Sequence, residues 1–459
     1  MFILMVVIFV LGYIAIALEH PLKVDKAASA LLIGSLTWVA YIMGAADIFN
    51  SGVSVAWNDF VASDPGLNTH EGMLEFIVHH QIIEHLGEIS QILFFLLGAM
   101  TIVEIIDQHQ GFKIITDKIT TTKKVKLLWI LSFLTFFMSA ALDNLTTTIV
   151  MVALLRKLIA DKETRWFFAS MVVLAANAGG AWSPIGDVTT IMLWIGGQVT
   201  AANIIAMVIV PSLVVMIVPV VYLSFTMKGN VSRPVLSAED QRDFTTGFER
   251  KLILFMGVGA LLFVPIFKTV THLPPYMGML LGLGVLWVTT ELMHKRKVGE
   301  DKRRLTVIGI LQKVDVPTVL FFLGILSAVA SMQSAGQLGL LATWLDEVTN
   351  NNIYVINTVI GILSSIVDNV PLVAGAMGMY DIQTVGHFAV DGVFWELLAL
   401  AAGTGGSILI IGSAAGVAAM GMEKIDFIWY MKKISLLAFL GYFAGIATYW
   451  LQATLLHAH

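Results

Sequence analysis

Residues 141–148 read Ala-Leu-Asp-Asn-Leu-Thr-Thr-Thr, and this stretch places the carboxylate of Asp143 inside an apolar segment. A second Asp-Asn pair, Asp368-Asn369, stands inside another apolar segment in the second half of the chain. A carboxylate at membrane depth costs several kcal/mol unless it is paired or hydrated, so each pair marks a candidate functional site.

Each Asp-Asn pair is followed by an apolar segment that glycines interrupt. Asn177-Ala178-Gly179-Gly180 leads to Gly186-Asp187 in the first half, and Gly403-Thr404-Gly405-Gly406 leads to Gly412-Ser413 in the second. The glycines of the two segments recur at a constant offset. We interpret the two regions as copies of one ion-site module.

The composition places the chain in a membrane. It is 57% hydrophobic and 13% charged over 459 residues, whereas a soluble domain is about 25% charged. Several runs reach the ~20 apolar residues that cross a bilayer, so we predict an all-α polytopic membrane protein with lipid as its surroundings. The chain has no cysteine, which excludes disulfides and thiolate metal sites. The net charge of −5 and the lack of a phosphate-binding loop argue against nucleic acid and ATP as partners.

Hydropathy predicts ten crossing segments and two hairpins. Residues 127–159 and 353–380 each comprise two limbs of roughly 11–15 residues around an Asp-Asn pair, which is typical of re-entrant hairpins. We read the first crossing as a retained span, because no basic region precedes it and no small-residue cleavage site follows it. The crossings lie near residues 2–18, 27–45, 89–107, 165–195, 203–227, 250–268, 275–294, 316–333, 394–421 and 433–452.

Charge sets the predicted orientation. With both hairpins placed as non-crossing, every lysine and arginine except Lys268 falls on one side of the membrane. Basic residues collect on the cytoplasmic side, so both termini are expected to be periplasmic. Five crossings separate the hairpins, and an odd number brings the second hairpin in from the opposite face.

The predicted organisation is therefore two inverted-topology repeats, each with five transmembrane helices, one of them broken, and a re-entrant hairpin. Inverted repeats with interrupted helices are typical of secondary transporters that work by alternating access. The first repeat covers residues 1–227, with its hairpin at 127–159 and its broken helix at 165–195; a cytoplasmic linker follows at 228–249; and the second repeat covers 250–459, with its hairpin at 353–380 and its broken helix at 394–421.

The chemistry is expected where the hairpin tips meet the broken helices. Carboxylates, amides and hydroxyls are hard oxygen donors that suit a small cation. An alternative is that each aspartate caps a half-helix, and any one hydroxyl could instead bond back to its own helix. The expected cation- and proton-binding residues are Asp143, Asn144, Asn177, Asp187, Thr189, Asp368, Asn369, Thr404, Ser407 and Ser413, with the metal ion at Asp143, Asp187 and Asp368.

Two further polar groups have open interpretations. Glu104 and Asp107 close the third crossing, either as ordinary interfacial residues or as a cytoplasmic entrance that gathers cations or relays protons. A histidine group stands in the outward segment 46–88, and we read it as a solvated interfacial helix. Its alternatives are a pH-sensitive outer gate or adventitious metal binding. That group comprises His70, His79, His80 and His85 with Glu71, Glu75, Glu84 and Glu88.

These motifs resemble the NhaD-type sodium/proton antiporters of the ion transporter superfamily, which also includes arsenite permeases and divalent-anion/sodium symporters. The resemblance covers essentially the whole chain and is most specific in residues 141–148, 177–190, 368–372 and 403–407. It implies a bacterial inner-membrane protein that exchanges Na⁺ or Li⁺ for H⁺ without a bound cofactor, and a homodimer. The ion-site residues that it implies are Asp143, Asn177, Asp187, Thr189, Asp368 and hydroxyls of the second broken helix.

Two other functions are weighed against exchange. A sodium-coupled dicarboxylate or oxyanion carrier would share the architecture, but three converging aspartates repel an anion. An intramembrane aspartyl protease would use two aspartates as a dyad, yet Asp143 follows leucine, and Asp187 stands in Pro-Ile-Gly-Asp. We therefore expect a transporter and not an enzyme, in which the cation and protons compete for the same carboxylates.

Overall fold

A computed structural model describes residues 1–17, 19–52, 54–63, 66, 68–234, 245–295, 305–366 and 368–456. Within these ranges the regular elements are helices, and the β contact is an isolated bridge between Lys123 and Asn230. Eight helices of the described part are long and apolar enough to cross a membrane. The predicted all-α polytopic membrane protein is confirmed.

The eight long apolar helices largely follow the predicted crossings, with α9 as the exception. α1 (Phe2–Ala17) occupies the first predicted crossing but has 16 residues, fewer than the roughly 20 that a span needs. The eight are α3 (Lys26–Met43), the continuous helix from His70 to Gln108, α9 (Lys124–Leu142), α13 (Ala201–Thr226), α14 (Gly247–Thr271), α15 (Pro275–His294), α18 (Val316–Ser334) and α25 (Ser435–Leu456).

The region predicted as the first hairpin contains a longer limb than expected. α9 has 19 residues because it extends through Lys124-Val125-Lys126 before the apolar run begins. α10 (Asn144–Leu158) has 15 residues, as predicted for a limb. In the second hairpin region, α20 (Ile353–Leu363) and α21 (Asn369–Met379) have 11 residues each.

The chain divides into two units by its internal contacts. The first comprises Met1–Phe94, Asp315–Ile356 and Val370–Gln383. Within it α3 packs along α18, and α1 packs along α3. A Cβ added at Gly34 would lie 2.5 Å from the carbonyl oxygen of Gly324, so glycine at this position allows the two helix backbones to approach closely. Trp38 Nε1 donates to Ser327 Oγ across the same pair at 3.0 Å.

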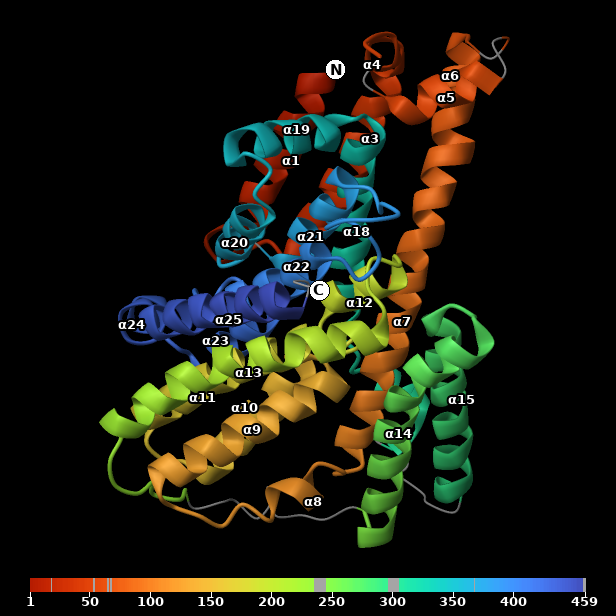
Figure 1. Ribbon diagram of the computed structural model, residues 1–459. Helices are drawn as coiled ribbons and strands as arrows, with labels where there is room; N and C mark the ends of the chain where they lie inside the picture. The colour runs from red at the N-terminus through yellow and green to blue at the C-terminus, as the bar shows by residue number, and fades with distance from the viewer. Residues whose placement is uncertain are drawn as a thin grey trace. The chain divides into compact units, whose positions relative to one another are not determined.

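The outward segment 46–88 differs from its prediction. It contains α4 (Ala45–Asn50), α5 (Val55–Ser63) and α6 (His70–Glu75), and α6 continues through the π-helix η2 (Phe76–Ile82) into α7 (Ile83–Gln108), as Figure 1 shows. The histidine stretch is therefore the start of the helix that forms the third crossing, and its interpretation as a solvated interfacial segment stays a prediction. The helix continues because no proline interrupts residues 70–108.

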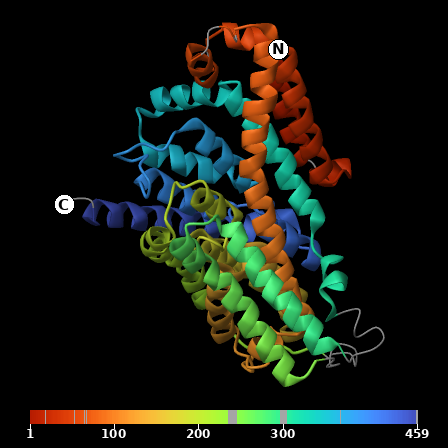
Figure 2. The ribbon, with the colours of Figure 1, turned by 90° about the vertical axis from the view of Figure 1, so that its right-hand side faces the viewer.

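The second unit comprises Phe95–Val314, Asn357–Asn369 and Thr384–His459. α9 and α10 each pack on α11 (Lys162–Ala181), and α13 runs along α25. α14 and α15 form a pair of neighbouring helices, which is seen from two directions in Figures 1 and 2. Two shorter helices, α22 (Val393–Gly405) and α23 (Ala414–Glu423), complete the part that holds the candidate site.

Each segment predicted as a broken helix consists of two helices with a turn between them. α11 ends at Ala181 and α12 (Val188–Ile195) follows, while α22 ends at Gly405 and α23 follows. Close backbone contacts require glycine at matching positions. A Cβ at Gly179 would lie 2.2 Å from Phe136 O, and a Cβ at Gly405 would lie 1.9 Å from Gly361 O. The recurrence supports a duplicated module, and the inverted relation of the two halves stays a prediction.

Candidate functional site

Asp143 forms the turn between α9 and α10. Its backbone has φ 87°, a region that costs a non-glycine residue about 1–3 kcal/mol. The side chain caps α10, because Oδ1 accepts from Thr146 N and Oδ2 from Thr146 Oγ1, both at 2.8 Å. Asp143 is therefore a helix cap in this structure, and the same contacts fix its charge at the tip of the turn.

Asp187 is the buried carboxylate of the site, with 1% of its surface exposed. It caps α12, since Oδ1 accepts from Thr189 N at 3.0 Å and from Thr189 Oγ1 at 2.9 Å. Its other oxygen, Oδ2, accepts from Asn144 Nδ2 at 2.7 Å. The structure thus brings together the predicted residues Asp187, Thr189 and Asn144.

Asn177 links this group to the second broken helix. Its Oδ1 accepts from Asn144 Nδ2 at 3.1 Å, and its Nδ2 donates to Ser407 Oγ at 2.8 Å and to Ser413 Oγ at 2.9 Å. Asn177 is fully buried. A continuous hydrogen-bonded network therefore runs from Asp187 to Ser407 and Ser413. We call its six members the ion-site network: Asn144, Asn177, Asp187, Thr189, Ser407 and Ser413.

Asp187 and Ser413 occupy equivalent backbone positions. Their φ and ψ angles are −146° and 142° for Asp187, and −141° and 152° for Ser413. Each caps the helix that follows its break, and Ser413 Oγ accepts from Gly416 N at 3.1 Å. The pairing of these two residues by sequence offset therefore matches their geometry, and of the two only Asp187 carries a charge.

Asp368 and Asn369 lie at the start of α21. The negative charges of Asp143 and Asp368 both act on Asp187. Asn369 is 5% exposed, and among the described residues its Nδ2 has no hydrogen-bond partner. Two further negative charges near Asp187 favour a bound cation or a bound proton there over the ionised empty site.

Besides Asp143, Asp368 and Asn369, three other predicted residues lie outside the hydrogen bonds of the ion-site network. Thr404 Oγ1 donates to Leu400 O of its own helix at 2.6 Å, which is the alternative weighed for any single hydroxyl. Glu104 accepts from Gln108 Nε2 at 2.8 Å near the end of α7, and Asp107 is exposed there. The geometry of Glu104 and Asp107 favours interfacial residues at a helix end.

Sequence reasoning missed two serine hydroxyls that join the predicted hairpin regions to the broken helices. Ser139 Oγ donates to Ala176 O at 2.6 Å, and Ser364 Oγ donates to Ala402 O at 2.8 Å. These two contacts recur at nearly the same offset as the glycines. Comparing all polar residues at that offset would have found them.

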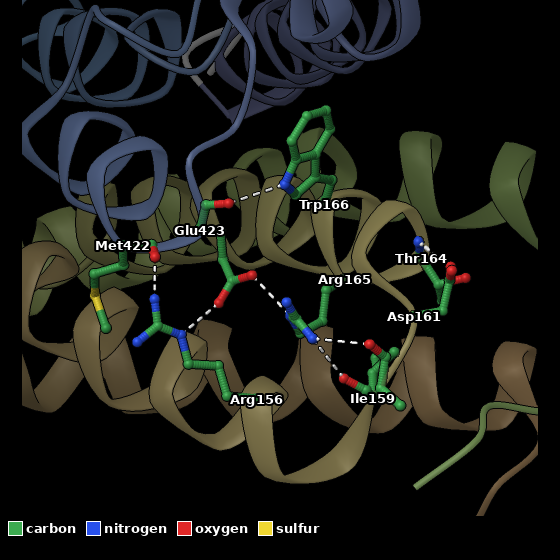
Figure 3. Close-up of polar contacts among 9 residues, drawn as sticks. Arg156, Ile159, Asp161, Thr164, Arg165, Trp166, Met422 and Glu423 are labelled. Carbon is green, nitrogen blue, oxygen red and sulfur yellow. Dashed lines mark hydrogen bonds and ion pairs between the residues drawn. The ribbon is translucent and has the colours of Figure 1, made fainter. Parts of the chain in front are cut away.

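A charged cluster ties together the far ends of the site helices (Figure 3). Glu423, whose side chain is 1% exposed, accepts from Arg156 Nε through Oε1 and from Arg165 Nε through Oε2, each at 2.7 Å. Trp166 Nε1 donates to Glu423 O at 3.0 Å. The opposite end of α10 and of α11 contains a residue of the ion-site network. The opposite end of α23 is capped by another residue of the network. The cluster therefore fixes these three helices relative to one another.

Replacing Glu423 by Gln is expected to lower the free energy of unfolding by about 3 kcal/mol, the low end for breaking a buried ion pair. The low end applies because Arg156 is 50% exposed and regains water. Thermal unfolding of the detergent-purified protein measures this as a drop of several degrees. The matched control is Glu163→Gln on the exposed first turn of α11, which should leave the unfolding temperature unchanged. Equal unfolding temperatures for both variants would refute the structural role of the cluster.

Comparison with known proteins places this site in a family. The sequence profile of the family described as "Citrate transporter" matches residues 13–405. The chain belongs to the citrate transporter family. The chain is 47% identical to Sodium/proton antiporter 1 of Arabidopsis thaliana over 97% of this chain and 71% of that protein. It is 45% identical to Sodium/proton antiporter 2 of the same plant, over 97% and 98%.

A bacterial relative carries the name that the motifs suggested. The chain is 31% identical to Na(+)/H(+) antiporter NhaD of Alkalimonas amylolytica, over 99% of this chain and 91% of that protein. The resemblance to NhaD-type antiporters is confirmed. In the described part of the chain, no group of three or more His, Cys, Asp or Glu side chains is arranged to hold a metal ion.

Proposed function

We propose that this protein of the citrate transporter family exchanges Na⁺ for H⁺ across a membrane. The observation that carries the proposal is the buried carboxylate of Asp187, held by neutral donors and coupled to Asp143 and Asp368. Asp187 binds either a proton or the cation, and the negative charges of Asp143 and Asp368 strengthen its attraction for both. Relatives that match nearly the whole chain are named sodium/proton antiporters, so Na⁺ and H⁺ are the transported substrates.

The exchange follows from competition at one site. A cation held by Asp187, with Asp143 and Asp368 nearby, excludes protons from the same oxygens. Protons on these carboxylates in turn remove the charge that attracts the cation. The ion-site network changes its access from one side of the membrane to the other with either substrate bound. If more protons than Na⁺ move per cycle, the membrane potential also drives exchange, with about 2.3 kcal/mol per charge at 100 mV.

Finer features of the function are part of the proposal. Li⁺ replaces Na⁺ because it is also a small hard cation. The two inverted repeats, the periplasmic termini, the bacterial inner membrane and the homodimer follow from the charge pattern and from the resemblance to bacterial NhaD. Relatives of this chain occur in both a plant and a bacterium. A role in pH homeostasis and salt tolerance follows from the exchange itself.

The family description names citrate, and anion transport is therefore the second candidate. The ion-site network consists of Asp, Asn, Thr and Ser side chains. It offers a tricarboxylate no positive charge, while Asp143 and Asp368 add negative charge beside it. The site geometry therefore favours cation exchange. The names of the relatives favour a transporter over an intramembrane protease as well.

A proteoliposome assay with an imposed pH gradient tests the proposed function. Purified protein is reconstituted with a pH-sensitive dye inside, and Na⁺, Li⁺, K⁺ or citrate is added outside. We expect Na⁺ and Li⁺ to dissipate the gradient and citrate to have no effect. Citrate uptake without Na⁺-dependent proton movement would overturn the proposal.

A further inference from the structure

Glu396 is a second buried carboxylate in the unit that holds the ion site. It lies in the first turn of α22 with 1% of its surface exposed, and it is not part of the ion-site network. Its neighbours on the helix, Trp395, Leu397 and Leu398, are fully buried apolar residues. A carboxylate in such a position is costly and marks a functional site by default.

Two polar side chains from other helices hold this carboxylate. Tyr449 Oη, on α25, donates to Glu396 Oε2 at 2.5 Å. Asn203 Nδ2, near the start of α13, donates to Glu396 Oε1. Both donors are neutral, and they bind different oxygens of the carboxylate, so each hydrogen bond helps to hold it in place.

The position of Tyr449 allows two protonation states without movement of heavy atoms. Its Oη lies 3.4 Å from Val393 O as well as 2.5 Å from the carboxylate. When Glu396 is ionised, the phenol donates to Oε2. When Glu396 is protonated, its own hydroxyl donates to Tyr449 Oη, and the phenol turns to Val393 O. The site therefore satisfies its hydrogen bonds in both states.

α22 connects this carboxylate to the ion site. A Cβ added at Gly403 would lie 3.8 Å from Asp187 Oδ2, so this face of α22 borders Asp187. Glu396 precedes Gly403 by seven residues, which is nearly two helical turns and about 10 Å along the axis. Glu396 thus lies along the same face, separate from the cation-binding oxygens.

Few other charged groups face Glu396 from the described elements around it. Within their bounds, α12 and α13 contain no Asp, Glu, Lys, Arg or His, and the titratable groups of α25 are Tyr442 and Tyr449. Those of α11, Lys162, Glu163 and Arg165, are in its first turn, remote from the Asn177 end. Before α22, Asp391 accepts from Thr200 N at 2.5 Å and from Thr200 Oγ1 at 2.8 Å, and the backbone carbonyl of His387 accepts from Phe394 N at 3.1 Å.

We propose that Glu396 is a second proton-binding site, which takes up and releases one proton in each transport cycle in addition to the protons that compete with Na⁺ at Asp187. This inference rests on the proposed Na⁺/H⁺ exchange. It raises the number of protons moved per Na⁺ by one. It also gives the exchange a dependence on membrane potential.

Glu396→Gln tests the proposal, because glutamine reproduces the protonated state. Its amide oxygen accepts from Asn203, and its amide nitrogen donates to Tyr449 Oη. The protein is reconstituted into liposomes of phosphatidylcholine and phosphatidylglycerol. Reversal potentials then give the H⁺/Na⁺ ratio, and ²²Na⁺/Na⁺ exchange reports Na⁺ binding without proton coupling. We expect the ratio to fall by one with ²²Na⁺/Na⁺ exchange within about twofold of wild type, because the substitution is remote from the network.

Asp391→Asn is the matched control, because it removes a carboxylate just before the same helix. Asn also tolerates the backbone of Asp391, which has φ 61°. This variant should keep both the ratio and ²²Na⁺/Na⁺ exchange. Tyr449→Phe keeps the carboxylate and removes one donor to its ionised form. It should shift the pH of half-maximal Na⁺/H⁺ exchange by about half a unit toward alkaline values, and it serves as the test if Glu396→Gln fails to insert.

The outcomes separate the proposals. An unchanged H⁺/Na⁺ ratio in Glu396→Gln, or a parallel loss of both exchange modes, would show a purely structural role and overturn the inference. An unshifted pH profile in Tyr449→Phe would do the same. A wild-type protein that catalyses no Na⁺-dependent proton movement would instead overturn the proposed function, and this inference with it.

Discussion

Replacing Asp187 by Asn is expected to abolish Na⁺-dependent proton movement while the protein still inserts into the membrane. The substitution keeps an amide that can cap α12, because Asn is as good a helix cap as Asp. It removes the buried charge that both substrates need. At an effective dielectric constant of about 20, the attraction between a carboxylate and a cation 4 Å away is about 4 kcal/mol. We therefore expect Na⁺ binding to weaken by at least about 100-fold, measured by isothermal titration in detergent and by transport in proteoliposomes.

Asp161→Asn is the matched control for this substitution. Asp161 caps α11 as Asp187 caps α12, and its side chain accepts from Thr164 N at 2.8 Å. The hydrogen bond from the Thr164 side chain holds the pKa of Asp161 below its usual range, so its charge is also present throughout the assay. Asp161→Asn should transport at the wild-type rate. Equal activity of the two variants would remove Asp187 from the site.

Ser413→Ala separates the role of the charge from that of its equivalent hydroxyl. Ser413 Oγ accepts from Asn177 Nδ2 and from Gly416 N, so alanine removes an oxygen but no charge. We expect weaker Na⁺ binding with the competition between Na⁺ and H⁺ preserved. The contrast with Asp187→Asn follows from the asymmetry of the two equivalent positions.

The broken helices were predictable because their signals are local. Glycine lowers helix stability and permits the backbone contacts that Gly179 and Gly405 make, so the breaks can be read from sequence. The apolar runs are equally local, and they predicted most of the long helices. The polar residues next to the breaks then identified most of the ion-site network, since side chains at a break face one another.

The remaining features depend on contacts between distant segments. The start of the long helix at His70 could not be read from hydropathy, because residues 70–88 mix polar and apolar side chains and packing decides their conformation. The direction of the Thr404 hydroxyl depends on whether its own helix or a neighbour offers the nearer acceptor. Glu396 was overlooked because its partner Tyr449 is distant in the sequence. Glu423 was overlooked because its partners Arg156 and Arg165 are also distant and adjoin a basic loop.

The most direct test of shared-site competition is the apparent KM for Na⁺ across the active pH range. Protons that occupy Asp143, Asp187 and Asp368 must leave before Na⁺ binds, so KM should rise as pH falls, by up to about tenfold per pH unit for each competing proton. The rate at saturating Na⁺ should change little, because saturating Na⁺ displaces the protons. An apparent KM that stays constant across the active pH range would contradict the account and require separate binding sites for Na⁺ and H⁺.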